Sequence, residues 1–181
     1  MAPERPPRYF FALWPSASAA GVLANARDAA ARDCGGRAMP TDSLHCTLVF
    51  LGEQDEAALS RTMAIADGLC SPPFDLCFDR LESWPHNRIV WAGASAAPPA
   101  LMQIAARLHS GLVSAGLGPL SGMTMPHITL LRNARTPAAL PPLAAAAWRC
   151  GEFVLARSAK KEASSSRYEV IARWPLAGGG E

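Results

Sequence analysis

The chain has 181 residues, half of them hydrophobic, which is enough apolar material for one domain or for two small lobes that share a core. The formal net charge of +2 is too small to indicate a nucleic-acid binder, so any contact with RNA would have to be local. The five cysteines are odd in number and lack CxxC spacing, which argues against a disulfide framework and against a zinc site.

The N-terminal residues 1–8 are rich in proline and contain no apolar stretch of the kind found in a signal peptide. No later segment approaches the length of a membrane span. We therefore expect a reduced, cytoplasmic protein that has no membrane partner and is a monomer.

The first half of the chain alternates predicted strands and helices. Pro15 breaks an aromatic strand, and Ser16 or Ser18 can cap the helix that follows, which Gly35 and Gly36 end. Short apolar runs predict the strands, and an apolar face at helical spacing predicts each helix. The expected elements are a buried strand at residues 9–14, a helix to about residue 33, a strand at 44–51, a helix at about 55–69 and a half-buried strand at 74–78.

The second half repeats this order of elements. It is predicted to contain a strand at 89–92, a helix at about 99–115, a strand beginning at His127, a helix from Pro141 through the alanines to Trp148, and strands at 152–156 and 168–174. We therefore expect one domain over residues 1–181, with interleaved repeats at about 8–82 and 88–158 and a final strand at 167–174. Two copies are too few for a solenoid and favour a pseudo-two-fold arrangement.

Two tetrapeptides share the frame His-x-Thr-Leu: His45-Cys46-Thr47-Leu48 and His127-Ile128-Thr129-Leu130. Residues i and i+2 of a strand point to the same face, so each motif presents an imidazole beside a hydroxyl. If the fold brings both strands together, the two histidines can act as general acid and general base in cleaving a P–O bond. The threonine hydroxyls can donate hydrogen bonds to the phosphate oxygens. Such chemistry needs no metal and no cofactor.

These motifs and their flanks resemble the 2H phosphoesterase superfamily. Residues 44–52 (Leu-His-Cys-Thr-Leu-Val-Phe-Leu-Gly) and 126–132 (Pro-His-Ile-Thr-Leu-Leu-Arg) are similar to its branch of RNA 2′,3′-cyclic phosphodiesterases, also called 2′-5′ RNA ligases. Residues 88–93 and 168–176 resemble that branch as well. The resemblance implies an α+β fold in which two pseudo-two-fold-related lobes have antiparallel sheets flanked by helices, with the active-site groove between the lobes.

The resemblance also implies a reaction. A 2′,3′-cyclic phosphate at an RNA end would be hydrolysed to a 2′-phosphomonoester, with His45 as proton donor, His127 as proton acceptor, and Thr47 and Thr129 binding the phosphate oxygens. The reverse step would join RNA through a 2′-5′ bond, and we rank it second because water is in large excess. From the residues alone the two motifs are nearly interchangeable, so the assignment of acid and base stays open.

Arg132 is a further candidate for phosphate binding. It lies five positions after His127, and in an ideal strand that parity puts it on the opposite face. It could reach a phosphate only if the strand bends or ends by then. The family often carries an arginine here, so a phosphate-binding role and a plain surface role both stay open.

The remaining residues with chemical potential have weaker signals. Cys46 occupies the variable position of its motif and is expected to face the core, not to act as a nucleophile. His86 and His109 match neither motif. A basic loop around Lys160, Lys161 and Arg167 is expected to be solvated, with a flap over the RNA end as the alternative.

Two other functions stay open. One is a 2H phosphodiesterase that acts on a cyclic nucleotide, on a cyclic phosphate of ADP-ribose or on a 2′-5′ oligonucleotide. The other is a non-catalytic RNA-binding module, against which the intact His and Thr of both motifs argue.

Overall fold

The computed structural model describes residues 6–118, 120–158 and 167–177. Its elements, in chain order, are β1 (Arg8–Leu13), α1 (Ala17–Cys34), β2 (Arg37–Ala38), the 3₁₀ turn η1 (Thr41–Ser43), β3 (Cys46–Glu53), α2 (Glu56–Asp67), β4 (Phe74–Phe78), β5 (Arg80–Trp84), the 3₁₀ turn η2 (Pro85–Asn87), β6 (Ile89–Gly93), α3 (Pro99–Ser114), β7 (Ser121–Gly122), β8 (His127–Arg132), β9 (Ala146–Cys150), β10 (Glu152–Ser158) and β11 (Tyr168–Pro175). Of the predicted basic loop, Lys160 and Lys161 lie outside the described residues, and Arg167 is exposed.

One nine-stranded sheet runs through the molecule in the order β11-β10-β1-β3-β8-β6-β5, with β7 paired to β3 and β2 paired to β8. The two motif strands β3 and β8 are neighbours at its centre and are joined by a single residue pair, Cys46 with Ile128. All pairings among the described strands are antiparallel, and β4 and β9 form a separate two-stranded sheet. The α+β class is therefore confirmed, and the sheets of the two lobes meet at the motif strands.

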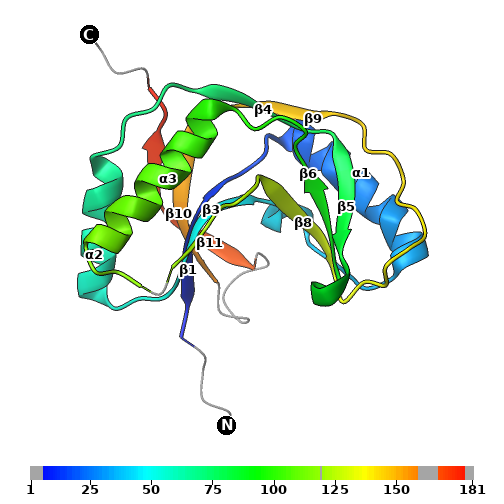
Figure 1. The fold of residues 1–181 in the computed structure, drawn as a ribbon, viewed down its shortest axis with the longest axis horizontal. Coiled ribbons are helices and arrows are strands. Elements are labelled where there is room, and N and C mark those ends of the chain that lie inside the picture. The colour runs from blue at the N-terminus through cyan, green and yellow to red at the C-terminus, as the bar shows by residue number, and fades with distance from the viewer. Residues whose placement is uncertain (1–5, 119, 159–166, 178–181) are drawn as a thin grey trace.

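Helices α1 and α3 each pack on the lobe that does not contain the strand preceding them in the chain (Figure 1). We call β1, β3, β7, β10 and β11 with α2 and α3 the His45 lobe, and β2, β5, β6 and β8 with α1 the His127 lobe. Helix α1 follows β1 of the His45 lobe but packs on β8, whereas α3 follows β6 of the His127 lobe but packs on β3. This reciprocal exchange supports the proposal of two interleaved repeats.

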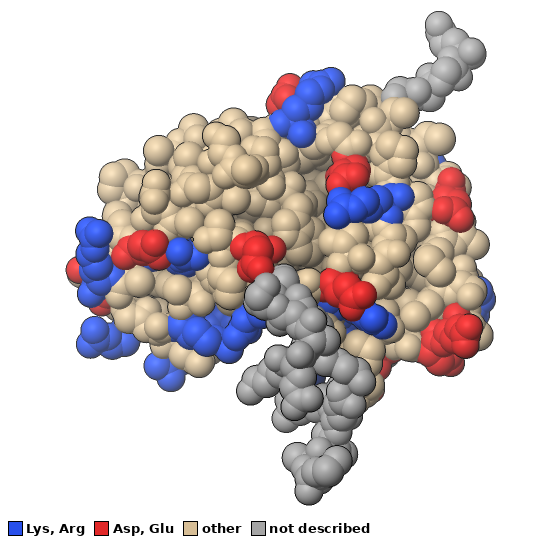
Figure 2. All heavy atoms as spheres, turned by 180° about the vertical axis from the view of Figure 1, so that it is seen from behind, with Lys and Arg blue, Asp and Glu red and all other residues tan. Residues whose placement is uncertain are grey.

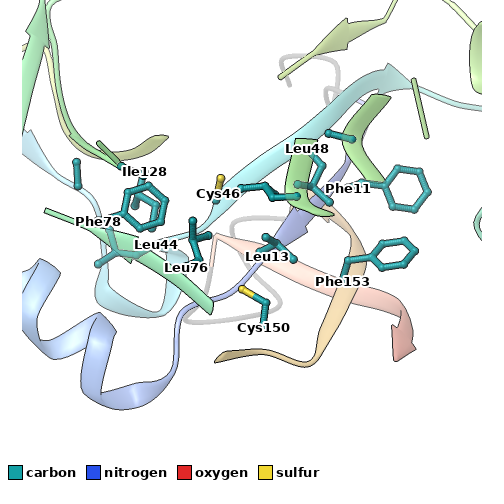
Figure 3. Packing of buried hydrophobic residues seen from close by; sticks show 14 of the residues in the cluster. Phe11, Leu13, Leu44, Cys46, Leu48, Leu76, Phe78, Ile128, Cys150 and Phe153 are labelled. Atoms are coloured by element: carbon teal, nitrogen blue, oxygen red, sulfur yellow. The ribbon is translucent and has the colours of Figure 1, made fainter. Parts of the chain in front are cut away.

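A continuous hydrophobic core joins the two lobes, and Figure 3 shows part of it. Cys46, Leu48, Ile128 and Leu130 are fully buried in it, at 0% exposure. These are the residues that alternate with the histidines and threonines along β3 and β8, as the period of two predicts. The expectation that Cys46 faces the core is confirmed.

The predicted helix from Pro141 to Trp148 is wrong. Residues 146–150 form strand β9, which pairs with β4 so that Trp148 lies opposite Leu76. Along β9 the residues are alternately buried and exposed, because every second side chain packs against the core. This alternation outweighs the helix propensity of the alanines. The second repeat therefore lacks the second helix that the sequence suggested, and β5 was not anticipated at all.

Charged side chains are dispersed on the face shown in Figure 2. Lys and Arg gather only along its lower left edge, and a large upper area has no charged residue. The mixed charges on this face fit the small net charge of +2. No helix in the described part of the chain combines the length and the apolar character needed to cross a membrane.

Candidate active site

The same backbone contact holds both motif histidines. The Nδ1 atom of His45 lies 2.8 Å from the carbonyl oxygen of Ser43, and the Nδ1 atom of His127 lies 3.1 Å from that of Met125. A carbonyl oxygen can only accept a hydrogen bond, so Nδ1 carries the proton in the neutral form of each ring. Each Nε2 is therefore the nitrogen available to exchange protons with a ligand.

Both histidines line one small pocket of about 100 Å³. The small size of this pocket and its largely polar lining suit a phosphate group. The pocket brings together all five residues that the sequence nominated, and three others complete it. Its lining is Met39, Ser43, His45, Thr47, His127, Thr129, Arg132 and Tyr168. His86 and His109 do not contribute to it.

A bulge in β8 explains how Arg132 reaches the pocket. The consecutive residues Leu130 and Leu131 are both buried, and the register against β6 shifts at this point. One extra residue reverses the parity of the strand. Arg132 therefore falls on the face of His127 and Thr129, which an ideal strand would not allow.

Strand β3 has the same bulge at Leu48 and Val49, where its register against β1 shifts. In each bulge the backbone carbonyl of the first leucine accepts a hydrogen bond from the residue that follows the short strand paired alongside, β7 for β3 and β2 for β8. These bonds run from Met123 N to Leu48 O (3.0 Å) and from Met39 N to Leu130 O (2.9 Å). The bulge in β3 places Phe50 where β8 has Arg132, so the two half-sites share a backbone but differ at this side chain.

His45 is surrounded by aromatic rings. It stacks on Phe10 and Trp14, with ring centroids 4.8 and 5.0 Å away, and meets the edge of Tyr168 at 4.9 Å. The pKa of His45 is lowered to about 4, mainly by burial and also by the positive charge of Arg132, while the carbonyl of Ser43 acts in the opposite direction. Without an anion, His45 is therefore neutral near pH 7.

His127 meets aromatic rings edge-on. Trp84 lies 4.8 Å and Trp91 6.0 Å from it, between ring centroids. Burial lowers the pKa of His127, the carbonyl of Met125 raises it, and the charge of Arg132 lowers it. No pattern in the sequence indicated these aromatic contacts, because they join residues that are far apart in the chain.

A second, larger pocket of about 390 Å³ adjoins the first. It shares His45, Thr47, Arg132 and Tyr168 with the small pocket, but neither His127 nor Thr129 lines it. Its other lining residues are Arg8, Phe10, Arg37, Phe50 and Ser158. The space beside the small pocket is therefore on the side of His45.

Two further features bear on the chemistry. Burial raises the pKa of the Cys46 thiol to about 12, so this cysteine is not a nucleophile near neutral pH. Within residues 6–118, 120–158 and 167–177, no group of three His, Cys, Asp or Glu side chains is arranged to hold a metal ion.

The family model of the 2′-5′ RNA ligase superfamily matches residues 14–162. The chain belongs to this family. It is 35% identical over 145 residues to the RNA 2′,3′-cyclic phosphodiesterase of Escherichia coli K12, covering 78% of this chain and 80% of that protein. The resemblance seen in the two motifs is thereby confirmed.

Solved structures of relatives have the same fold. The crystal structure of E. coli LigT complexed with 3′-AMP superposes with a TM-score of 0.86 at 31% identity, covering 95% of this chain and 99% of that chain. A protein of Thermus thermophilus superposes with a TM-score of 0.76 at 28% identity, covering 96% of this chain and 100% of that chain. The two-lobed α+β architecture is thus that of the family.

Proposed function

We propose that this protein hydrolyses the 2′,3′-cyclic phosphate at an RNA end to a 2′-phosphomonoester. One observation carries the proposal: two imidazoles, each fixed through Nδ1, line a phosphate-sized pocket with two threonines and one arginine. Its E. coli relative is named an RNA 2′,3′-cyclic phosphodiesterase. E. coli LigT has been crystallised with 3′-AMP and with phosphate.

The reaction needs one acid and one base. His127 accepts a proton from water through Nε2 as the water oxygen attacks phosphorus. The P–O3′ bond breaks, and His45 donates its Nε2 proton to the departing O3′. The phosphate stays on O2′, so the products are a 2′-phosphomonoester and a 3′-hydroxyl, and no other reactant is required.

The position of the larger pocket supports this assignment of roles. In an in-line displacement the leaving oxygen is opposite the attacking water, and the leaving O3′ is attached to the ribose. The ribose therefore needs space on the side of the proton donor. That space adjoins His45 and Thr47 and not His127, which favours His45 as donor.

Arg132 and the two threonines stabilise the negative charge on the non-bridging phosphate oxygens in the transition state. Thr47 and Thr129 donate hydrogen bonds to the non-bridging oxygens, and the guanidinium of Arg132 adds a positive charge. Burial, and to a smaller extent this positive charge, lowers the pKa of both histidines in the free protein. A bound phosphate anion offsets this effect and raises the pKa of His45, so His45 takes up the catalytic proton from solvent when the substrate binds.

The mechanism we propose needs no metal ion, and the reverse reaction would be a 2′-5′ ligation. A cytoplasmic location and a monomeric state stay predictions from the sequence.

The test is product analysis on an oligoribonucleotide that ends in a 2′,3′-cyclic phosphate, with and without EDTA. We expect a 2′-phosphorylated product in both, and none from a His45→Ala/His127→Ala protein purified in the same way. Activity lost in EDTA and restored by a divalent ion would contradict the mechanism. Turnover of a cyclic mononucleotide without turnover of RNA would favour the alternative substrate class. RNA binding without any turnover would favour a binding module.

A further inference from the structure

The larger pocket has more positive charge than a single cyclic phosphate requires. Three arginines line it, Arg8, Arg37 and Arg132, and no acidic residue is among its lining side chains in the described ranges. Within those ranges, none of the three makes an ion pair. Four other strand arginines do pair with carboxylates: Arg80 with Glu82, Arg149 with Asp75, Arg157 with Glu169 and Arg173 with Glu152. The pocket arginines therefore have charge available for a ligand.

Arg37 is held directly opposite Arg132. The two residues are register partners in the antiparallel pair of β2 and β8, so their side chains lie on the same face. Gly36 fixes this approach, because a Cβ atom there would lie 2.7 Å from the carbonyl oxygen of Arg132. Like charges directly opposite on paired strands repel each other unless an anion lies between them.

Arg8 approaches the same pocket from β1. Its backbone N–H donates to Oγ of Ser158 at 2.9 Å, which fixes the first residue of the strand beside the end of β10. Phe50 forms an apolar wall of this pocket and is 37% exposed. The larger pocket therefore combines three arginines, on β1, β2 and β8, with an apolar wall. This combination suits a ligand that has both an anionic group and a flat apolar group.

We propose that the larger pocket binds a phosphate on the 5′ side of the terminal nucleoside of the substrate, with Arg37 and Arg8 as its ligands. Arg132 lines both pockets and would therefore be near both this phosphate and the cyclic one. A volume of about 390 Å³ is within the usual range for small-ligand sites. Arginine forks match the geometry of phosphate oxygens.

This inference rests on the proposed function and narrows its substrate class. Every internal nucleotide of an RNA strand has a phosphodiester on its 5′ oxygen, whereas a free nucleoside cyclic phosphate has a hydroxyl there. The protein therefore prefers a strand end to a nucleoside 2′,3′-cyclic phosphate.

The kinetic test compares three substrates with the same cyclic phosphate: adenosine 2′,3′-cyclic phosphate, its 5′-phosphorylated form, and a dinucleotide that ends in the same group. We expect kcat/KM to be about 10-fold higher for both substrates that have a 5′ phosphate. Arg37→Ala and Arg8→Ala should each remove most of this preference. Arg149→Ala, which loses an exposed arginine on β9, is the matched control and should keep it.

Equal kcat/KM for all three substrates, or a preference that survives in the Arg8→Ala/Arg37→Ala protein, would overturn the proposal. A preference for the 5′-phosphomonoester without one for the dinucleotide would overturn the assignment to RNA strands.

A binding measurement separates this inference from the proposed function. Adenosine 2′,5′-bisphosphate should bind about 10-fold more tightly than adenosine 2′-phosphate, and Arg37→Ala should abolish the difference. If no substrate is turned over but this difference is found, the proposed reaction fails while the second phosphate site stands. Equal affinities in the intact protein would refute the site even if hydrolysis is observed.

Discussion

The half-site of His45 and the half-site of His127 have the same backbone but different surroundings. Each histidine bonds to the carbonyl two residues earlier, each threonine follows two residues later, and each strand bulges just beyond. His45, however, stacks on aromatic faces and lines the larger pocket. His127 meets aromatic edges and does not line that pocket.

This difference shows how two nearly identical motifs can take opposite roles. The shared backbone gives each imidazole the same tautomer and the same free nitrogen. The larger pocket is lined by His45 and not by His127, and the residue after each bulge is Phe50 on the His45 side and Arg132 on the other. In the proposed mechanism, the surroundings, more than the motifs, therefore distinguish the acid from the base.

The largest expected effect tests whether both half-sites act in catalysis. His45→Ala and His127→Ala should each lower kcat for cyclic-phosphate hydrolysis by about 10²–10⁴-fold, the usual contribution of a general acid or base. His86→Ala, which replaces an exposed histidine outside both pockets, is the control and should have near-normal kcat. A folded motif variant with near-normal kcat would remove that histidine from the chemistry.

The second effect is a dependence of folding stability on pH that comes from the lowered pKa of His45. Its pKa is about 4 in the folded protein and about 6.5 when unfolded, so the unfolded chain binds the proton more readily. The stabilisation is complete above pH 6.5 and is lost as the pH falls towards 4, because protonation then favours unfolding. From pH 7 to pH 4 this loss is on the order of 3 kcal/mol of unfolding free energy.

Denaturant unfolding of the intact protein and of His45→Gln over this pH range measures the effect. As the pH falls from 7 to 4, the intact protein should lose about 3 kcal/mol more unfolding free energy than the variant, which lacks the titrating imidazole. A difference that is independent of pH would mean that His45 titrates normally in the folded state.

The smallest effect should separate the aromatic contacts of the two half-sites. Trp14→Leu removes a stacked ring from His45, exposes the imidazole and should raise its pKa. Trp84→Leu should instead raise the pKa of His127 and leave that of His45 unchanged. NMR titration of the two imidazole rings measures both values. Parallel shifts of both histidines in either variant would contradict independent surroundings.

The features that depend on a local pattern of residues, such as strand alternation and helix capping, could be predicted from the sequence. The period of two put the histidines and threonines on one face and Cys46 in the core, and helix α1 begins after Ser16 as the capping rule allows. Arg132 could not be placed, because the bulge that turns it depends on the pairing of β8 with β6. Strand β9 was missed because its partner, β4, lies in the other half of the chain and its alanines favour helix.

The most direct test of the central claim, that His45 protonates the leaving oxygen and His127 activates water, replaces the leaving oxygen by sulfur. A cyclic phosphorothiolate with sulfur at the 3′ position has a leaving thiolate, which needs little protonation because thiols are far more acidic than alcohols. We predict that His45→Ala will recover most of its lost rate on this substrate relative to the oxygen substrate, while His127→Ala will stay as impaired as before. Recovery by His127→Ala instead, or equal impairment of both variants on both substrates, would contradict the account.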